Sequence, residues 1–267
     1  MTALDARTSV AGEPIVMRRL SKSYVTAAGR SPVLDGIDLE IAPGELISLV
    51  GPSGCGKSTI LKILAGLIPY DGGEVSLGGQ PPLEGRRDVG FMLQQAVLMP
   101  WRSVGDNVRL PFDIAGVKGP QVDQRISELV ELVGLSHATD HRPWELSGGM
   151  QQRVSLARAL ALDPGVMLLD EPFSALDEFK REHLGLEFTR MHEALGRTTI
   201  LVTHSIPEAV LMSDRIIALG TNPGRVVADV RVDLPRPRTA SMIGTPSFME
   251  TSQRVRDALV GEDGAIA

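Results

Sequence analysis

The chain has 267 residues, of which 43% are hydrophobic and 22% are charged, and its net charge is −6 at pH 7. This length and composition suit one large α/β domain, alone or with an inserted subdomain, around a sizeable apolar core. The acidic balance argues against a nucleic-acid partner, which would need a basic face. Cys55 is the only cysteine, so no disulfide can form within the chain, and no apolar run approaches the roughly 18 residues that span a bilayer.

The first half of the chain predicts strands and one helix around a glycine-rich loop. The first 14 residues are small and polar, so we expect a flexible N-terminal tail and a protein kept in the cytosol. Apolar patterning and turn residues then predict β segments and a helix. The β segments are expected at 15–24, 32–41, 45–50 and 72–79, and the helix at 56–67.

The second half alternates helical and strand-like patterns. Residues from about 90 to 163 carry apolar side chains at helical spacing and predict a mostly helical insert. Strands are then expected at 166–170, 198–204 and 215–220, with a helix at 178–196 between the first two and a last helix at 246–261. This alternation predicts an α/β fold in which helices cover both faces of a parallel or mixed sheet.

The sequence GPSGCGKS at residues 51–58 matches the phosphate-binding pattern G-x-x-x-x-G-K-[ST], and it lies between an expected strand and an expected helix. Glycines let successive backbone N–H groups surround phosphate oxygens, and the helix N-terminus adds partial positive charge. Lys57 would reach the β- and γ-phosphates, and the Ser58 hydroxyl would bind Mg²⁺. The alternative is a turn that only ends a strand. The expected nucleotide-binding residues are Gly51, Pro52, Ser53, Gly54, Cys55, Gly56, Lys57, Ser58 and Thr59.

The sequence VMLLDE at residues 166–171 predicts a buried strand that ends in two acids. Ligands bind beyond this end of the strands in open α/β sheets. A nucleotide hydrolase needs an acid near the metal and a group that positions water. Asp170 is therefore the candidate Mg²⁺ ligand, and Glu171 is the candidate general base. The alternative is that both acids only cap the following helix.

The motifs GPSGCGKST, LSGGMQQR, VMLLDE and SALD, and a histidine after ILVT, follow one another in this order. Together they resemble the nucleotide-binding subunit of an ABC transporter over about residues 15–220. LSGGMQQR is the most specific of them, because other P-loop ATPases lack it. The resemblance implies a P-loop NTPase with a RecA-like mixed sheet core, an antiparallel β subdomain and an inserted α-helical subdomain. We expect an ATPase domain at 15–235, with the helical part at about 90–163, and a C-terminal tail at 236–267.

The segment LSGGMQQR, residues 146–153, runs from a Ser-Gly-Gly turn directly into a helix. A hydroxyl and free backbone amides at a helix start form an anion site. In the family that the chain resembles, this turn contacts the γ-phosphate of ATP bound by a second subunit. The resemblance therefore implies that Ser147, Gly148 and Gly149 act across a head-to-tail dimer, which we expect to be a homodimer. The alternative is a buried helix start capped by Ser147.

The resemblance also implies roles for four further residues. Gln94 would contact Mg²⁺ and the attacking water, with its neighbour Gln95 as the alternative. His204 would hydrogen-bond the γ-phosphate, and Asp177 would cross the dimer interface. Tyr24 would stack on adenine, although a lone tyrosine in a strand more often packs.

Three segments, LMPWRSVGDNV, LLDEPFSALDEFKREHL and NPGRVVADVRVDLPRPR, resemble the ATPases of nitrate, aliphatic sulfonate and taurine importers. This resemblance implies a bacterial importer with separate permease subunits, an indirect solute-binding protein, and a peripheral location at the cytoplasmic face of the membrane. Residues 94–106 would receive a permease coupling helix, with apolar surface at residues 99–101, unless Trp101 only packs within the insert. The alternative function is a soluble ABC-type ATPase that acts as an assembly factor.

Overall fold

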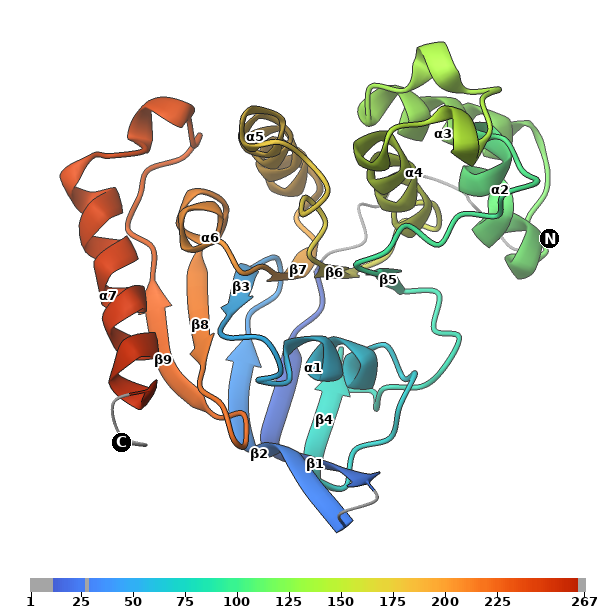
Figure 1. Ribbon diagram of the computed structural model, residues 1–267. Coiled ribbons are helices and arrows are strands. Elements are labelled where there is room, and N and C mark those ends of the chain that lie inside the picture. The colour runs from blue at the N-terminus through green and yellow to red at the C-terminus, as the bar shows by residue number, and fades with distance from the viewer. Residues whose placement is uncertain (1–11, 27–28, 264–267) are drawn as a thin grey trace.

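The computed structural model describes residues 12–26 and 29–263 (Figure 1). The strands are β1 (Ile15–Thr26), β2 (Gly29–Ile41), β3 (Leu46–Val50), β4 (Gly72–Leu77), β5 (Val89–Met92), β6 (Val166–Asp170), β7 (Thr198–Val202), β8 (Arg215–Leu219) and β9 (Val226–Arg231). The helices are α1 (Lys57–Leu64), α2 (Val104–Ala115), α3 (Pro120–Leu132), α4 (Gly148–Ala159), α5 (Glu178–Leu195), α6 (Ile206–Met212) and α7 (Pro246–Asp263). Short 3₁₀ turns are η1 (Ser136–Ala138), η2 (Pro143–Glu145) and η3 (Ala240–Met242).

The strands form two sheets. A three-stranded antiparallel sheet has the order β2-β1-β4, and a six-stranded sheet has the order β5-β6-β7-β3-β8-β9. The first five strands of the larger sheet are parallel, whereas β9 runs antiparallel to β8. The prediction of a mixed core sheet with a separate antiparallel sheet and added helices is confirmed.

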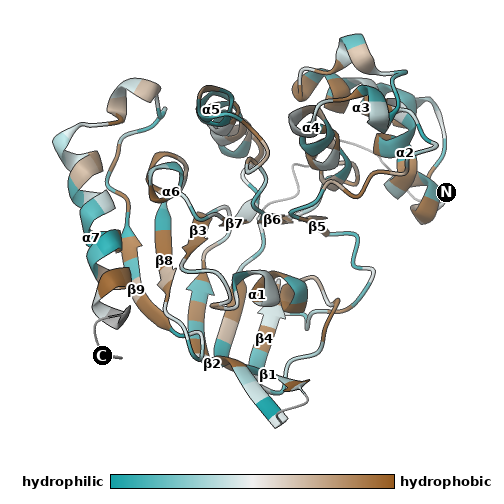
Figure 2. Ribbon diagram, viewed as in Figure 1, coloured by the Kyte–Doolittle hydropathy of each residue, from teal (hydrophilic) through white to brown (hydrophobic). Residues whose placement is uncertain are grey.

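Strand β6 is buried on both faces, as expected for a central parallel strand. Side chains alternate between the faces. Val166 and Leu168 join the apolar cluster around α1 and the antiparallel sheet, whereas Met167 and Leu169 join the cluster of helices α2, α3 and α4. Figure 2 shows this hydrophobic character in the central strands. Helices α1 and α4 therefore lie on opposite faces of the sheet.

Two strands lie where the sequence patterns did not predict them. Residues 89–92 form edge strand β5, paired with β6, at the start of the block that was expected to be helical. Residues 226–231, which lack a separate strand prediction, form β9 at the opposite edge. Short runs of this kind carry no periodicity that separates a strand from other structure, so only pairing with a neighbour defines them.

The expected N-terminal tail is described only in part. Residues 1–11 lie outside the described residues. The Gly12 backbone N–H donates to the Gly196 carbonyl at 3.0 Å, and the Thr198 hydroxyl donates to the Glu13 carbonyl at 2.6 Å. Residues 12–14 are therefore held against the start of strand β7. In the described residues, no helix combines the length and the apolar character needed to cross a membrane.

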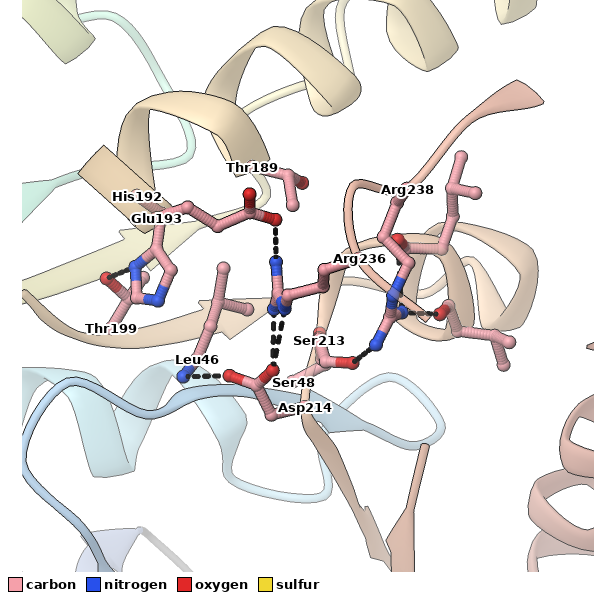
Figure 3. A network of polar contacts seen from close by, with 12 residues as sticks. Leu46, Ser48, Thr189, His192, Glu193, Thr199, Ser213, Asp214, Arg236 and Arg238 are labelled. Atoms are coloured by element: carbon pink, nitrogen blue, oxygen red, sulfur yellow. Dashed lines mark hydrogen bonds and ion pairs between the residues drawn. The ribbon is translucent and has the colours of Figure 1, made fainter. Parts of the chain in front are cut away.

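A polar network fastens the segment after β9 to the core (Figure 3). The Arg236 guanidinium contacts Glu193 of α5 and donates to Asp214 at 2.6 Å. Asp214 also accepts a hydrogen bond from the Leu46 backbone N–H at 2.9 Å. Arg236 and Asp214 thus link α5 to the starts of strands β3 and β8, at the strand ends opposite to residues 51–58.

Arg238 lies deeper in the same network and is only 2% exposed. Its guanidinium donates to the carbonyls of Val210, Leu211 and Ser213 at the end of α6, at 2.8–3.3 Å. Burial lowers the pKa of Arg238 to about 10. Carbonyl groups at a helix C-terminus lack hydrogen-bond donors within the helix and carry partial negative charge. The Arg238 guanidinium provides both the donors and a positive charge.

We predict that Arg238→Met lowers the free energy of unfolding by about 1–3 kcal/mol, because the buried carbonyls at the end of α6 lose their donors. Urea unfolding followed by far-UV circular dichroism measures the change. Arg256→Met, at an exposed position of α7, is the matched control and should leave stability unchanged. Equal stability of wild type and Arg238→Met would contradict this account of the network.

Candidate active site

The C-terminal ends of four neighbouring parallel strands bring the expected site residues to one edge of the sheet. In the order β5-β6-β7-β3, strand β5 is followed by Gln94, β6 ends at Asp170 and Glu171, β7 is followed by His204, and β3 is followed by residues 51–58. Parallel pairing makes these ends meet although residue 51 and residue 204 lie far apart in the chain. This is the edge at which open α/β sheets bind ligands.

The P-loop, residues 51–58, requires its glycines. Gly56 has φ of 97°, and a Cβ atom there would lie 2.4 Å from Leu34 Cδ2. The Lys57 ammonium donates to the carbonyls of Gly51 and Pro52 at 2.7 and 2.8 Å. The loop therefore curls around the lysine, which is the shape that lets a cation and backbone N–H groups surround a phosphate.

The remaining loop residues differ in exposure. Ser53 and Gly54 are exposed, Thr59 is half-buried, and Cys55 is fully buried. The Lys57 ammonium lies 3.6 Å from Cys55 Sγ. Cys55 thus lies beneath the loop, next to the lysine, while residues 52–54 form its outer surface.

Ser58 of α1 and Asp170 of β6 are in contact, and they are two of the three expected Mg²⁺ ligands, of which Gln94 is the third. The Ser58 hydroxyl donates to Asp170 Oδ1 at 3.1 Å. Asp170 is 4% exposed, and burial raises the pKa of its carboxyl, opposed by the hydrogen bond from Ser58. A hydroxyl and a carboxylate are oxygen ligands of the kind that Mg²⁺ uses together with nucleotide phosphates. This donor pair fits the expected ion.

Glu171 contacts the side chains of residues that follow the two neighbouring strands, β5 and β7. Gln94 Nε2 donates to Glu171 Oε2 at 3.1 Å, and His204 Nδ1 lies 3.4 Å from the same oxygen. Glu171 has φ of 46°, a left-handed conformation that is uncommon outside glycine and that often marks functional sites. Asp170 contacts Ser58, whereas Glu171 contacts Gln94 and lies close to His204, so the two adjacent acids have different partners.

The Ser-Gly-Gly turn begins helix α4 in the expected manner. The Ser147 hydroxyl accepts a hydrogen bond from the Met150 N–H at 3.3 Å, and both Ser147 and Gly148 are exposed. Gly149 is buried, and a Cβ atom there would lie 2.1 Å from Leu176 Cδ2. The turn therefore presents a hydroxyl and free helix-start amides to solvent, while Gly149 lets α4 approach the segment that precedes α5.

Ser147 and Asp177 lie apart from the P-loop. Asp177 begins α5, where it accepts from the Lys180 N–H at 3.0 Å and pairs with the Lys180 ammonium; these contacts with Lys180 hold the pKa of the Asp177 carboxyl below its usual range. In the described part of the chain, no hydrogen bond or ion pair joins Ser147 or Asp177 to residues 51–58. Helices α4 and α1 also occupy opposite faces of β6. The Ser-Gly-Gly turn at residues 147–149, which we term the signature turn, thus does not contact the P-loop of the same chain.

Tyr24 lies in β1 with its side chain 40% exposed, and the Lys22 ammonium lies 5.6 Å from its ring centroid. Tyr24 pairs with Ser31 on β2, three residues before Leu34, which packs against Gly56 of the P-loop. Three residues of a strand span about 10 Å. Tyr24 therefore lies on the strand pair that packs against the P-loop, and part of its ring is exposed to solvent.

Sequence reasoning overlooked two residues of α4 that hold the segment after β5. Gln152 Nε2 donates to the Gln94 carbonyl at 2.5 Å, and Arg158 Nη1 donates to the Val97 carbonyl at 2.6 Å. The available signal was a glutamine on the apolar face of an amphipathic helix, where a polar side chain needs a specific partner.

The sequence is similar to those of known ATP-binding proteins of ABC transporters. The family model described as "ABC transporter" matches residues 34–174. The aliphatic sulfonates import ATP-binding protein SsuB of Bacillus subtilis is 42% identical over 234 residues, which are 88% of this chain and 89% of SsuB. The taurine import ATP-binding protein TauB of Escherichia coli O157:H7 is 39% identical over 220 residues, 82% and 86% of the two chains.

Among solved structures, the chain is similar to the dimeric post-hydrolysis state of the ATP-binding cassette MJ0796 bound to ADP and Pi. The TM-score is 0.75 at 32% identity, over 83% of this chain and 100% of that chain. With its P-loop, acid pair and signature turn placed as described, and with this family match, the chain belongs to the ABC transporter family as an ATP-binding ATPase.

Proposed function

We propose that this ATPase energises an importer for a small oxyanion, namely nitrate, an aliphatic sulfonate or taurine. The observation that carries the hydrolytic role is the Glu171 carboxylate, held by Gln94 and close to His204, beside the Ser58–Asp170 pair. The names of the relatives SsuB and TauB support import over a soluble assembly role.

Nucleotide binding would use the loop and its lysine. The Lys57 ammonium would exchange the carbonyls of Gly51 and Pro52 for the β- and γ-phosphates, and the backbone N–H groups of residues 53–59 would surround them. Ser58 and Asp170 would hold Mg²⁺, which neutralises charge on the transferred phosphoryl group. Tyr24 would stack on adenine through its exposed ring.

Hydrolysis would depend on the carboxylate of Glu171 as general base. Gln94 donates to one oxygen of this carboxylate and so fixes its orientation toward an attacking water. The Gln94 side chain would also contact Mg²⁺ and this water. His204 has its Nδ1 atom toward Glu171 and is 60% exposed, which leaves its Nε2 atom available to a γ-phosphate oxygen.

We predict that Glu171→Gln lowers kcat for ATP hydrolysis by about 10²–10⁴-fold while ATP still binds, because the amide cannot accept the proton of the water. Phosphate release and equilibrium ATP binding measure the two properties. Glu131→Gln, on the exposed surface of α3, should match the wild type in both. A Glu171→Gln protein that hydrolyses ATP at the native rate would exclude Glu171 as the base.

We also propose that the functional unit is a homodimer in which Ser147, Gly148 and Gly149 of one copy seal the nucleotide bound by Lys57 of the other. The exposed turn at the start of α4 supplies an anion site that its own P-loop does not use. Asp177, exposed at the start of α5, would cross the same interface. The dimeric state of the similar cassette supports this arrangement.

The composite site predicts complementation between two inactive variants. Lys57→Ala removes the phosphate cation, and Ser147→Arg fills the opposite wall, so each homodimer should be inactive. A mixed dimer holds one intact pair of Lys57 and Ser147, so an equal mixture should recover roughly a quarter of the wild-type ATPase rate if the two sites act independently. An inactive mixture, with subunit exchange verified by differently labelled copies, would contradict a site shared between chains.

The permease would contact the face formed by β5, α2 and the segment before α2. A groove of about 450 Å³ is lined among others by Val89, Phe91 and Ile114, which come from β5 and α2, and the segment before α2 lies outside its lining. Trp101 is 67% exposed, which argues against simple packing within the block, and the Arg142 guanidinium links it to the exposed Trp144. Apolar surface of this kind suits a coupling helix. Docking there would place the protein peripherally at the cytoplasmic face of the membrane, with the solute-binding protein acting only through the permease.

We predict that Trp101→Ala leaves the ATPase rate of the isolated protein unchanged but weakens its association with the permease by about 2 kcal/mol or more, as for a buried aromatic anchor. Co-purification and solute-stimulated ATPase activity of the assembled importer measure the effect. Val25→Ala, at an exposed apolar residue of β1, is the control. Transport assays with nitrate, an alkanesulfonate and taurine on the same assembly identify the solute.

A further inference from the structure

Helix α4 holds both ends of the segment at residues 94–97, which we term the Q-loop. Gln152 Nε2 donates to the Gln94 carbonyl at 2.5 Å, and Arg158 Nη1 donates to the Val97 carbonyl at 2.6 Å. The two side chains are six residues apart, which is about 9 Å along a helix. The Q-loop is therefore fastened to the helix that begins with Ser147.

Gln152 is an unusual residue for its surroundings. It is 5% exposed, and its Oε1 atom has no hydrogen-bond partner. Leaving a buried amide oxygen without a partner is unfavourable, and an apolar side chain of the same size would avoid this desolvation cost. The contribution of Gln152 therefore lies in the bond from its Nε2 atom to the Gln94 carbonyl, and not in apolar packing.

Apolar side chains of α4, such as Val154, pack in the same cluster as Met167 and Leu169 of β6. A cavity of about 350 Å³ separates α4 from α5, with Gln152 and Leu156 on one wall and Phe173, Leu184 and Phe188 on the other. The polar bonds from Gln152 and Arg158 to the Q-loop add a direct link between α4 and the segment that follows β5.

Gln94 connects this link to Glu171. Its carbonyl accepts from Gln152, and its side chain donates to Glu171 Oε2 at 3.1 Å. We propose that Gln152 is a positioning residue that holds the Gln94 backbone against helix α4. The placement of α4 then determines the contact between the Gln94 side chain and Glu171. The inference rests on the proposed roles of Gln94 and Glu171 in hydrolysis.

The first test replaces Gln152 by leucine, which keeps the size but removes the donor. In the full-length protein with ATP and Mg²⁺, kcat should fall about 10- to 100-fold, as for a misplaced catalytic group, while KM for ATP changes less than about twofold. Thr189→Val removes another buried hydrogen bond, from Thr189 to Gly185 within α5, and should leave kcat unchanged. Native kcat in Gln152→Leu, or an equal loss in Thr189→Val, would overturn the proposal.

The second test separates positioning from general loosening of the fold. If Gln152 acts through Gln94, adding Gln152→Leu to Gln94→Ala should lower kcat by less than about twofold further, because residues that act as one unit are not additive. Full multiplication of the two losses would overturn the proposal. Gln152→Met repeats both tests should the leucine variant fail to fold.

The positioning role of Gln152 and the hydrolytic role of Gln94 and Glu171 can be tested separately. If Glu171→Gln is inactive and Gln152→Leu is fully active, the positioning role is wrong and the proposed hydrolytic role stands. If Gln94→Ala hydrolyses ATP at the native rate, the proposed role of Gln94 is wrong, and the route from Gln152 to Glu171 is overturned with it.

Discussion

Parallel pairing of strand β6 with β5 and β7 is the constraint on which the site depends. Leu168 pairs with Phe91 on one side and with Ile200 on the other. Because this register is fixed, Gln94, Glu171 and His204, which follow the strand ends by one or two residues, meet at one edge of the sheet. A slip by one residue would exchange the two faces of β6, so that Val166 and Leu168 would change places with Met167 and Leu169 and the packing on both faces would be lost. This packing holds the register and thereby the site.

The same strand separates two adjacent acids into two environments. Asp170 remains in the buried strand and contacts Ser58, whereas Glu171 adopts a left-handed backbone and reaches Gln94 and His204. A buried carboxyl beside a hydroxyl suits a metal ligand, and a carboxylate held by an amide suits a base. The two acids of one dipeptide therefore have different partners, as the two proposed roles require.

The helical block adds a second dependency, because α4 packs on the face of β6 opposite to α1. Its exposed start cannot complete the P-loop of the same chain, which is the physical basis for proposing a site shared between two copies. Gln152 and Arg158 attach the same helix to the Q-loop. Helix α4 begins at the proposed anion site and holds the Q-loop along its side. Under the proposals above, a nucleotide bound at the start of α4 would therefore affect the position of Gln94.

The sequence by itself determined the P-loop, the acid pair and the Ser-Gly-Gly turn, and it indicated a parallel or mixed sheet, because these features depend on local spacing, glycine geometry or apolar periodicity. Only the tertiary structure decided that Gln94 and not Gln95 contacts Glu171, that Trp101 is exposed, that β5 and β9 belong to the core sheet, and that Gln152 holds the Q-loop. These features arise from pairing and packing between segments far apart in the chain, which no local pattern encodes.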